Sequence, residues 1–311
     1  MKLLGKRILA GRRLFRQALR GVAIGPEDQI AVVGDQEARV FAPNGKQLHR
    51  WPTRLAGRSV AFDRVGNMLV GQTGQIEQFD RTGRSILLVD DQPRLGRVTA
   101  LALWAESAQM PECLLVADAT GRCLRRYDAR HAWLADLGAD NNTHGFLIPN
   151  GRLDFCVARA GLGRPGGMGA GMEDSTDTAT IFAANPAKHR LEQYTFEGNL
   201  IGHFGRFGHR PEDFSGCCNP ISLTITAQGE LVVAEKAPPR IKVFDLQGQL
   251  LAVANCELLD PNCKHLALAS DRRGRILVAD TQGMNLVRFE PERQANRRDS
   301  DAAHQQEQVP A

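Results

Sequence analysis

Long apolar runs, frequent cysteines and a large excess of one charge are all missing from this 311-residue sequence. No apolar run approaches the ~18 to 20 residues that a membrane-spanning helix needs, so the sequence predicts no transmembrane helix. The seven cysteines are odd in number and far too sparse for a disulfide scaffold. They indicate a reducing compartment, and we expect a soluble cytoplasmic protein.

The positive charge is concentrated at the N-terminus. The formal net charge is +4, yet residues 1–20 carry seven basic side chains and no acid, which leaves −3 for the remainder. Nucleic-acid binding needs a broad basic surface that neutralises many phosphates, and the remaining chain lacks the charge for one. Nucleic acid is therefore not expected as a partner. The seven residues are Lys2, Lys6, Arg7, Arg12, Arg13, Arg16 and Arg20.

A second interpretation of the N-terminus concerns export. The run Arg12-Arg13-Leu14-Phe15 is similar to a twin-arginine signal, which would place the protein in the periplasm. A signal peptide needs an uninterrupted apolar segment of about 7 to 15 residues, whereas basic residues break every apolar stretch here. The cytoplasm stays the favoured location, with the periplasm as the alternative.

Glycine is abundant, with 31 residues, and the chain repeats itself. Six segments end in an aromatic residue, between 38 and 67 residues apart, and in four of them a glycine follows four residues later. Each is preceded by a strongly apolar segment and, before that, by a segment of small residues. Such a repeat is typical of a β-propeller. The six aromatics are Phe41, Phe79, Tyr127, Tyr194, Phe244 and Phe289.

The repeat predicts an all-β fold, a six-bladed propeller of four-stranded antiparallel blades. Small residues suit the crowded innermost strands, and the aromatic of the third strand fills the widening gap between blades. The last repeat lacks a fourth strand, so we expect residues 1–18 to supply it and close the ring, because an open ring would leave unpaired edges. Residues 19–291 then form the propeller. Residues 292–311 lack apolar periodicity and are expected to be a solvated tail.

Two repeats resemble the NHL repeat. Residues 276–290 contain Leu-Val-Ala-Asp followed by Asn-Leu-Val-Arg-Phe, and residues 114–127 match nearly as well. The Gly-Cys-Cys-Asn-Pro run at residues 216–220 is similar to that of a bacterial subgroup of NHL-type propellers. The resemblance implies a binding platform. Six-bladed relatives include calcium-dependent lactonases and an amidating lyase, but residues 20–25 lack the Glu-Gly-Pro opening associated with the lactonases.

Four cysteines fall in two connections between blades. Cys217 and Cys218 lie between the fourth and fifth blades, and Cys256 and Cys263 lie between the fifth and sixth. Equivalent connections emerge on one face of a propeller, so the four thiols are expected to converge near the channel mouth. Three interpretations stay open: ligation of zinc or an iron–sulfur cluster, two disulfides, or packed thiols. The accessory candidates near this face are His144, His209 and His265, of which His265 also suits a turn.

Two further patterns are ambiguous. Each second strand ends in an acid or amide, which favours turn capping over a ring of cation ligands. The glycine-rich residues 161–172 lack the features of a phosphate loop, and they indicate an insertion or a lid. The acids and amides at the ends of the second strands are Asp35, Gln72, Asp118, Asn185, Glu235 and Asp280.

We expect a monomeric binding platform for a protein or small ligand at the rim and channel mouth. The alternative is a metal- or thiol-dependent enzyme.

Overall fold

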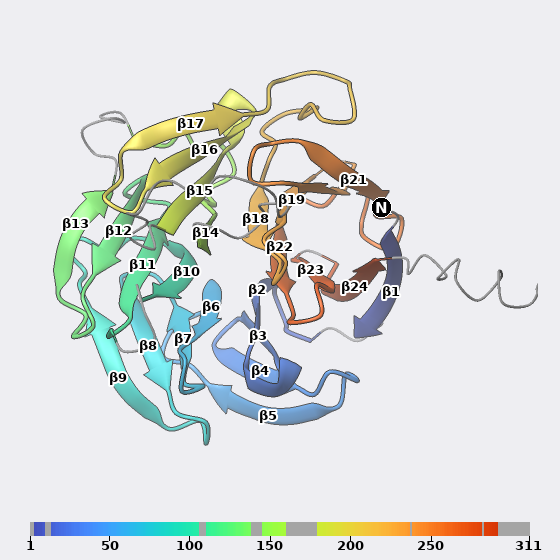
Figure 1. The fold of residues 1–311 in the computed structure, drawn as a ribbon. Coiled ribbons are helices and arrows are strands. Elements are labelled where there is room, and N and C mark those ends of the chain that lie inside the picture. Colours follow the sequence, from blue (N-terminus) through green and yellow to red (C-terminus); the bar gives the residue numbers. More distant parts are fainter. Residues whose placement is uncertain are drawn as a thin grey trace, which may run out of the picture.

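The structure is a computed structural model that describes residues 3–9, 14–105, 110–137, 145–159, 179–236, 238–281 and 283–291. Within these residues, six four-stranded antiparallel sheets stand as blades around a central axis (Figure 1). The predicted six-bladed propeller is confirmed. No helix in this part of the chain has the length and apolar content to cross a membrane. The glycine-rich residues 161–172, His144 and the tail at 292–311 lie outside the described residues.

Each blade follows the same order from the axis outward. The inner strands are β2 (Leu19–Ile24), β6 (Ser59–Phe62), β10 (Val98–Trp104), β14 (Phe155–Arg159), β18 (Ser222–Ile225) and β22 (Leu266–Ser270). The second strands are β3 (Ile30–Gly34), β7 (Met68–Gly71), β11 (Cys113–Asp118), β15 (Ala179–Asn185), β19 (Leu231–Glu235) and β23 (Ile276–Asp280). The third strands are β4 (Glu37–Phe41), β8 (Gln75–Phe79), β12 (Cys123–Tyr127), β16 (Arg190–Thr195), β20 (Arg240–Phe244) and β24 (Asn285–Pro291). The outer strands are β5 (Gln47–Pro52), β9 (Ser85–Asp90), β13 (Trp133–Leu137), β17 (Leu200–Phe204), β21 (Leu250–Asn255) and β1 (Leu3–Leu9).

The N-terminal strand completes the sixth blade. β1 pairs antiparallel with β24, from Leu3 opposite Pro291 to Leu9 opposite Leu286, and its sheet runs β1-β24-β23-β22 (Figure 1). The last blade therefore takes its outer strand from the start of the chain and its other three from the end. This pairing covers the free edge of β24 and confirms that the N-terminus closes the ring.

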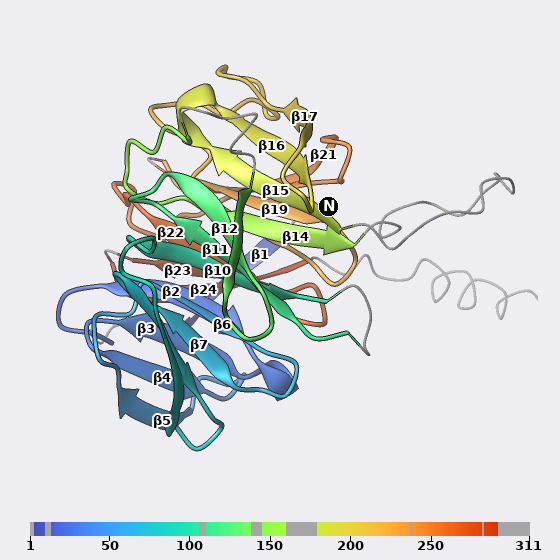
Figure 2. The ribbon, with the colours of Figure 1, turned by 90° about the vertical axis from the view of Figure 1, so that its left-hand side faces the viewer.

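The core consists of the seams between blades. Figure 2 shows the sheets of neighbouring blades stacked beside one another. Each seam holds its own apolar cluster, built from the facing sides of two neighbouring sheets. The six repeated aromatics are at most 4% exposed, and each lies in a different cluster. An aromatic is the largest apolar side chain available, so it suits the wide outer part of a wedge-shaped gap. The predicted role of these aromatics is confirmed.

The second-strand carboxylates bind the connections between blades. Asp118 accepts hydrogen bonds from the backbone N–H groups of Thr120 and Gly121 in its own turn, at 2.9 and 3.0 Å. The same side chain also accepts from Gly96, at 3.0 Å, in the connection that leads into β10. Three other blades repeat this contact. The second-strand carboxylates therefore cap their own turns and also fix the connections that lead into the inner strands. The equivalent pairs are Asp35 with Arg16, Glu235 with Ser215, and Asp280 with Asp260.

Candidate functional site

Basic residues stand where the inner strands begin. Arg58, Arg97 and Lys264 lie at or next to the residue that precedes β6, β10 and β22, and Arg20 is the second residue of β2. The fifth blade lacks such a residue before β18, but a lysine directly follows its second strand. We call the set the basic mouth, because the corresponding ends of the inner strands lie at one end of the channel. It consists of Arg20, Arg58, Arg97, Arg152, Lys236 and Lys264.

Four residues of the basic mouth line a cavity of about 250 Å³. A second cavity of about 480 Å³ occupies the central channel, and its walls are formed by the inner strands of all six blades. Thr99 and Arg152 line both cavities. The two spaces therefore follow one another along the channel, with Arg152 at the boundary. The side chains of the outer cavity include Arg20, Arg58, Lys264, His265 and Thr281.

Arg152 connects opposite sides of the ring. It precedes β14 in the fourth blade, and its Nη1 donates a hydrogen bond to the backbone carbonyl of Arg20 in the first blade, at 3.1 Å. These two blades face each other across the channel (Figure 1). Its Nη2 lies 3.4 Å from Oδ2 of Asp154, while Nε is buried with no hydrogen-bond partner among the described residues. The guanidinium therefore spans the channel and keeps an unused donor.

Asp154 is the only carboxylate paired with the basic mouth among the described residues. It is 6% exposed, and its Oδ2 also accepts a hydrogen bond from the Ser222 hydroxyl in the fifth blade. Burial raises the pKa of Asp154, against the opposing effect of Arg152 and the hydrogen bond from Ser222. A carboxyl group whose charged form is disfavoured in this way neutralises Arg152 only incompletely.

Within the part of the chain that the structure describes, the other mouth cations have neutral partners or none. Arg58 Nε donates to the Thr73 hydroxyl at 2.8 Å, and Lys236 Nζ donates to Oδ1 of Asn150 at 3.0 Å. Among the described residues, Arg152 alone of the six forms an ion pair. Burial, followed by repulsion from Arg20 and Arg97, lowers the pKa of Arg58. The site therefore has an uncompensated positive charge that an anion would relieve.

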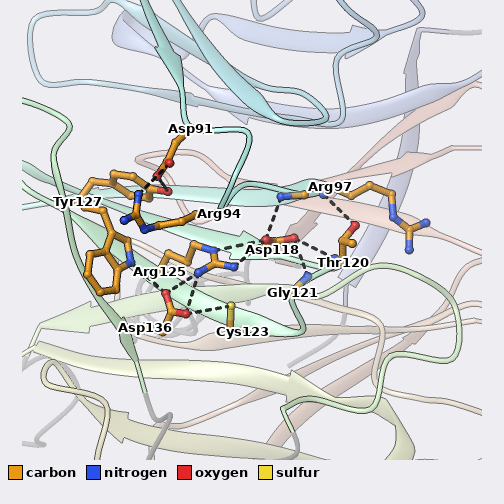
Figure 3. A network of polar contacts seen from close by, with 12 residues as sticks. Asp91, Arg94, Arg97, Asp118, Thr120, Gly121, Cys123, Arg125, Tyr127 and Asp136 are labelled. Carbon is orange, nitrogen blue, oxygen red and sulfur yellow. Dashed lines mark hydrogen bonds and ion pairs between the residues drawn. The ribbon is translucent and has the colours of Figure 1, made fainter.

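The acids of the third blade do not neutralise Arg97. Asp118 pairs with Arg125 at 3.2 Å, and Arg125 pairs in turn with Asp136 at 2.6 Å. Figure 3 shows the Arg97 guanidinium extending away from this network, while its backbone N–H donates to the Thr120 hydroxyl at 3.1 Å. These carboxylates are therefore satisfied within their own blade, and the charge of Arg97 remains available at the mouth.

The positive charge of the basic mouth affects the ionisation of His265. Burial lowers the pKa of its imidazole to about 4, and Arg152, Lys236, Arg20 and Lys264 contribute to the shift by repulsion. Its Nδ1 is buried and has no hydrogen-bond partner within the described ranges, whereas its backbone carbonyl accepts from the Thr281 hydroxyl at 3.0 Å. At neutral pH the side chain is therefore a neutral imidazole, held beside four positive charges.

We expect a bound anion to raise the pKa of His265. The free protein should show an imidazole pKa of about 4, and saturating phosphate should move it upward because the anion cancels part of the repulsion. The measurement is an NMR pH titration of the histidine ring protons, assigned with His265→Gln. A pKa near 6.5 in the free protein, or one that phosphate leaves unchanged, would contradict this description of the mouth.

The four candidate cysteines lie as two pairs. The Sγ atoms of Cys217 and Cys218 are 2.6 Å apart, with Cys217 exposed and Cys218 buried. Cys256 and Cys263 are buried in the apolar cluster between the fifth and sixth blades, where burial and the neighbouring thiol raise the pKa of Cys256 to about 12. Within the described residues no group of three or more Cys, His, Asp or Glu side chains is placed to hold a metal ion. A joint metal site stays a prediction.

The structure distinguishes the candidate histidines. His265 lines the mouth cavity, and His209 does not. His209 is exposed, and its ring packs edge-on against Phe207 with centroids 5.9 Å apart. His144 lies outside the described residues. Of the three accessory candidates, His265 is therefore the one that contacts the mouth cavity.

The basic mouth was not predicted from the sequence, although a signal for it is present. In five of the six repeats a basic residue stands one or two positions ahead of the small-residue segment. Each such residue looks like an ordinary surface charge when one repeat is viewed alone. Superposing the repeats would have shown that these charges share a position, and the ring then brings that position together at one end of the channel.

Comparison with known proteins agrees with the fold. No family model and no curated protein sequence matches this chain. Among solved structures, the chain is similar to the WD40 β-propeller domain of Doa1, with a TM-score of 0.57, 13% identity, and coverage of 93% of this chain and 98% of that chain. A gluconolactonase from Xanthomonas campestris gives 0.60 and 15%, with 92% and 88% covered, and a streptogramin B lyase gives 0.53 and 8%, with 93% and 97% covered. At these identities the likeness shows a β-propeller and nothing about activity.

Proposed function

We propose that this chain is an NHL-type propeller of the Gly-Cys-Cys-Asn-Pro subgroup, which acts as a binding platform. Its basic mouth takes a small ligand that carries phosphate or carboxylate groups. One observation carries this proposal: four of the six cationic side chains of the basic mouth line a cavity of about 250 Å³, and among the described residues one carboxylate pairs with the six. The repeated Val-Ala-Asp ends of the second strands at residues 116–118 and 278–280 support the NHL assignment.

The energetics favour an anion at this place. Five of the six cations are partly buried, so solvent screens their mutual repulsion less than it would at an open surface. Hydrogen bonds from charged donors contribute about 1.5 to 3 kcal/mol each, and guanidinium groups match carboxylate and phosphate oxygens in two-point contacts. The Nε atoms of Arg20 and Arg152, which have no partner among the residues that the structure describes, are donors of this kind. An anion would satisfy donors that the protein leaves unused.

The shape of the site favours a small ligand over nucleic acid. A duplex presents phosphates along its length, and proteins that bind it carry basic residues across a broad surface. Here the cations converge on a cavity at one end of the channel, and Arg152 forms the boundary with the channel behind it. Such a site encloses one or two anionic groups. A protein partner would reach the site through a single acidic side chain.

Replacing mouth arginines should weaken anion binding. We expect Arg20→Gln and Arg152→Gln each to reduce affinity for phosphate or citrate by about tenfold or more, because each loses a charged donor worth about 1.5 to 3 kcal/mol. Calorimetric titration of the full chain at low salt measures this. Arg84→Gln, at an exposed arginine in the turn between β8 and β9, is the matched control and should bind as the parent does. Equal affinity in all four proteins, or tighter binding of duplex DNA than of citrate, would refute the proposal.

The alternative is a metal- or thiol-dependent enzyme that uses the cysteines on the same face. It makes a different prediction, namely zinc or iron near one per chain in protein purified without oxygen. In that case Cys217→Ser and Cys256→Ser should each lose the metal, because a four-cysteine site needs both pairs. Anion binding by Arg20 and Arg152 does not depend on this outcome, so the two measurements separate the hypotheses.

A further inference from the structure

We propose that Cys217 and Cys218 are a reversible oxidation site beside the basic mouth, where the two thiols close a disulfide between neighbouring residues. Their Sγ atoms are 2.6 Å apart. Two non-bonded carbon atoms are normally separated by about 3.5 to 4.0 Å, so the two sulfurs are closer than an ordinary contact between side chains. A disulfide bond measures about 2.03 to 2.05 Å. The reduced loop therefore already holds both sulfurs in position to react with each other.

The two thiols differ in accessibility in a way that suits a two-step reaction. Cys217 is exposed, whereas Cys218 is 8% exposed. A dissolved oxidant therefore reaches Cys217 first, and Cys218 is placed behind it as the resolving thiol. Burial and the neighbouring thiol raise the pKa of Cys218, while Lys236 opposes this rise. The interaction with Lys236 also places the pair beside the basic mouth.

The backbone of this loop is held by contacts that do not involve sulfur. Asn219 is 2% exposed, and its side-chain amide donates to the carbonyls of Ser215 and Lys236 at 2.7 and 3.1 Å. Its Oδ1 accepts from the backbone N–H of Lys236 at 2.9 Å. Since Asn219 directly follows Cys218, these bonds fix the chain next to the pair in either redox state. Oxidation can then proceed without unfolding the loop.

The reaction balances with a low-molecular-weight disulfide as the oxidant. The Cys217 thiolate attacks one sulfur of that disulfide, whose S–S bond breaks and releases one thiolate. Cys218 then gives its proton to solvent and attacks Sγ of Cys217, which breaks the mixed disulfide and releases the second thiolate. Two protein thiols are oxidised, and one disulfide is reduced to two thiols. An excess of a small dithiol reverses both steps.

Cys256 and Cys263 provide an internal control. Both are buried, at 3% and 0% exposed, in the cluster that also contains Ile221 and Leu259. Burial raises the pKa of Cys256 to about 12, so its thiolate is scarce at neutral pH. The buried pair should therefore not react with the same oxidant in the folded protein, although it also consists of two cysteine thiols.

The test is to treat the folded full chain with oxidised glutathione and to map its thiols by mass spectrometry. The tryptic peptide that ends at Lys236 contains Cys217 and Cys218 and no other cysteine. We expect it to lose two hydrogen atoms and to regain them with dithiothreitol. Cys218→Ser should instead stop at a glutathione adduct on Cys217, and Cys217→Ser should stay largely unmodified at this peptide. Cys256→Ser should react as the parent does.

Three results would overturn the proposal. One is a lasting glutathione adduct on Cys217 in the parent protein, which would mean that Cys218 cannot resolve it. Another is oxidation of the Cys256–Cys263 pair at the same rate, which would show that the reaction follows unfolding. The third is an unreacted parent protein under conditions in which a small dithiol peptide is oxidised. Circular dichroism melting of each variant confirms that the compared proteins are folded.

Discussion

Removing residues 1–10 should lower the free energy of unfolding by about 5 kcal/mol and cause the protein to self-associate. β1 pairs with β24 over six register positions, and each backbone hydrogen bond contributes about 0.5 to 1.5 kcal/mol net. The deletion also exposes the edge of β24, which can then pair with another chain. Chemical denaturation gives the first quantity, and size-exclusion chromatography over a range of protein concentrations gives the second.

The control for this experiment is removal of residues 292–311, which the sequence predicts to be a solvated tail. That deletion should leave both the unfolding midpoint and the elution volume unchanged. A β1 deletion that behaves like the tail deletion would contradict ring closure as a source of stability. A β1 peptide added back in trans should restore part of the loss, because the pairing is intermolecular in that case and follows mass action.

The ring could be predicted because its sequence pattern is local and repeated six times. Each blade contributes a small-residue strand, an apolar strand and an aromatic-ended strand, and the six aromatics set the register. Even closure by the N-terminus followed from counting, since the sixth repeat lacks an outer strand after Phe289. What the pattern could not supply is the role of the second-strand acids in binding the connections. Contacts such as that of Asp280 with the Asp260 backbone depend on how neighbouring blades are placed.

The basic mouth was missed for a related reason. Arg152 and Arg20 are 132 residues apart in the sequence and come together only because the ring places the first and fourth blades on opposite sides of one channel. The net charge also gave no sign of the site, because residues 21–311 have a formal charge of −3 although cations are concentrated at the mouth. Acidic side chains of the blades are neutralised away from the mouth; Arg125, for example, pairs with both Asp118 and Asp136. Charge totals describe a chain, whereas a site depends on where each charge is neutralised.

Removing the charge of Glu235 should destabilise the protein by about 3 to 5 kcal/mol. Glu235 and Lys242 are both fully buried in the fifth blade, with Lys242 Nζ 3.0 Å from Oε2 of Glu235. Breaking a buried pair on one side leaves an uncompensated charge, which costs about this much. Glu235→Gln is a sharp test, because the amide oxygen can still accept the Ser215 N–H that Oε1 accepts now, at 3.0 Å. Urea unfolding of the two proteins measures the difference.

The double variant Glu235→Gln/Lys242→Met should recover much of that loss. It removes both buried charges at similar volume, and such replacements are often neutral. The complete cycle, with Lys242→Met alone as the fourth protein, isolates the interaction between the two side chains. A double variant as unstable as the sum of the single variants would mean that Glu235 acts through Arg240, whose Nε lies 2.9 Å from Oε2 of Glu235.

The pH dependence supplies an independent check on the same pair. Burial lowers the pKa of Lys242; attraction to Glu235 and Asp213 opposes this change, and Arg240 reinforces it. Without the Glu235 charge, the folded-state pKa of Lys242 should fall further, so between that value and the unfolded-state value of about 10.4 the unfolded chain binds more protons. Stability of Glu235→Gln should therefore rise relative to the parent protein as pH increases from 7 to 10. A deficit that stays constant over this range would show that Lys242 does not carry the cost, and Glu235→Gln/Lys242→Met, which has no lysine to titrate there, should show no such rise.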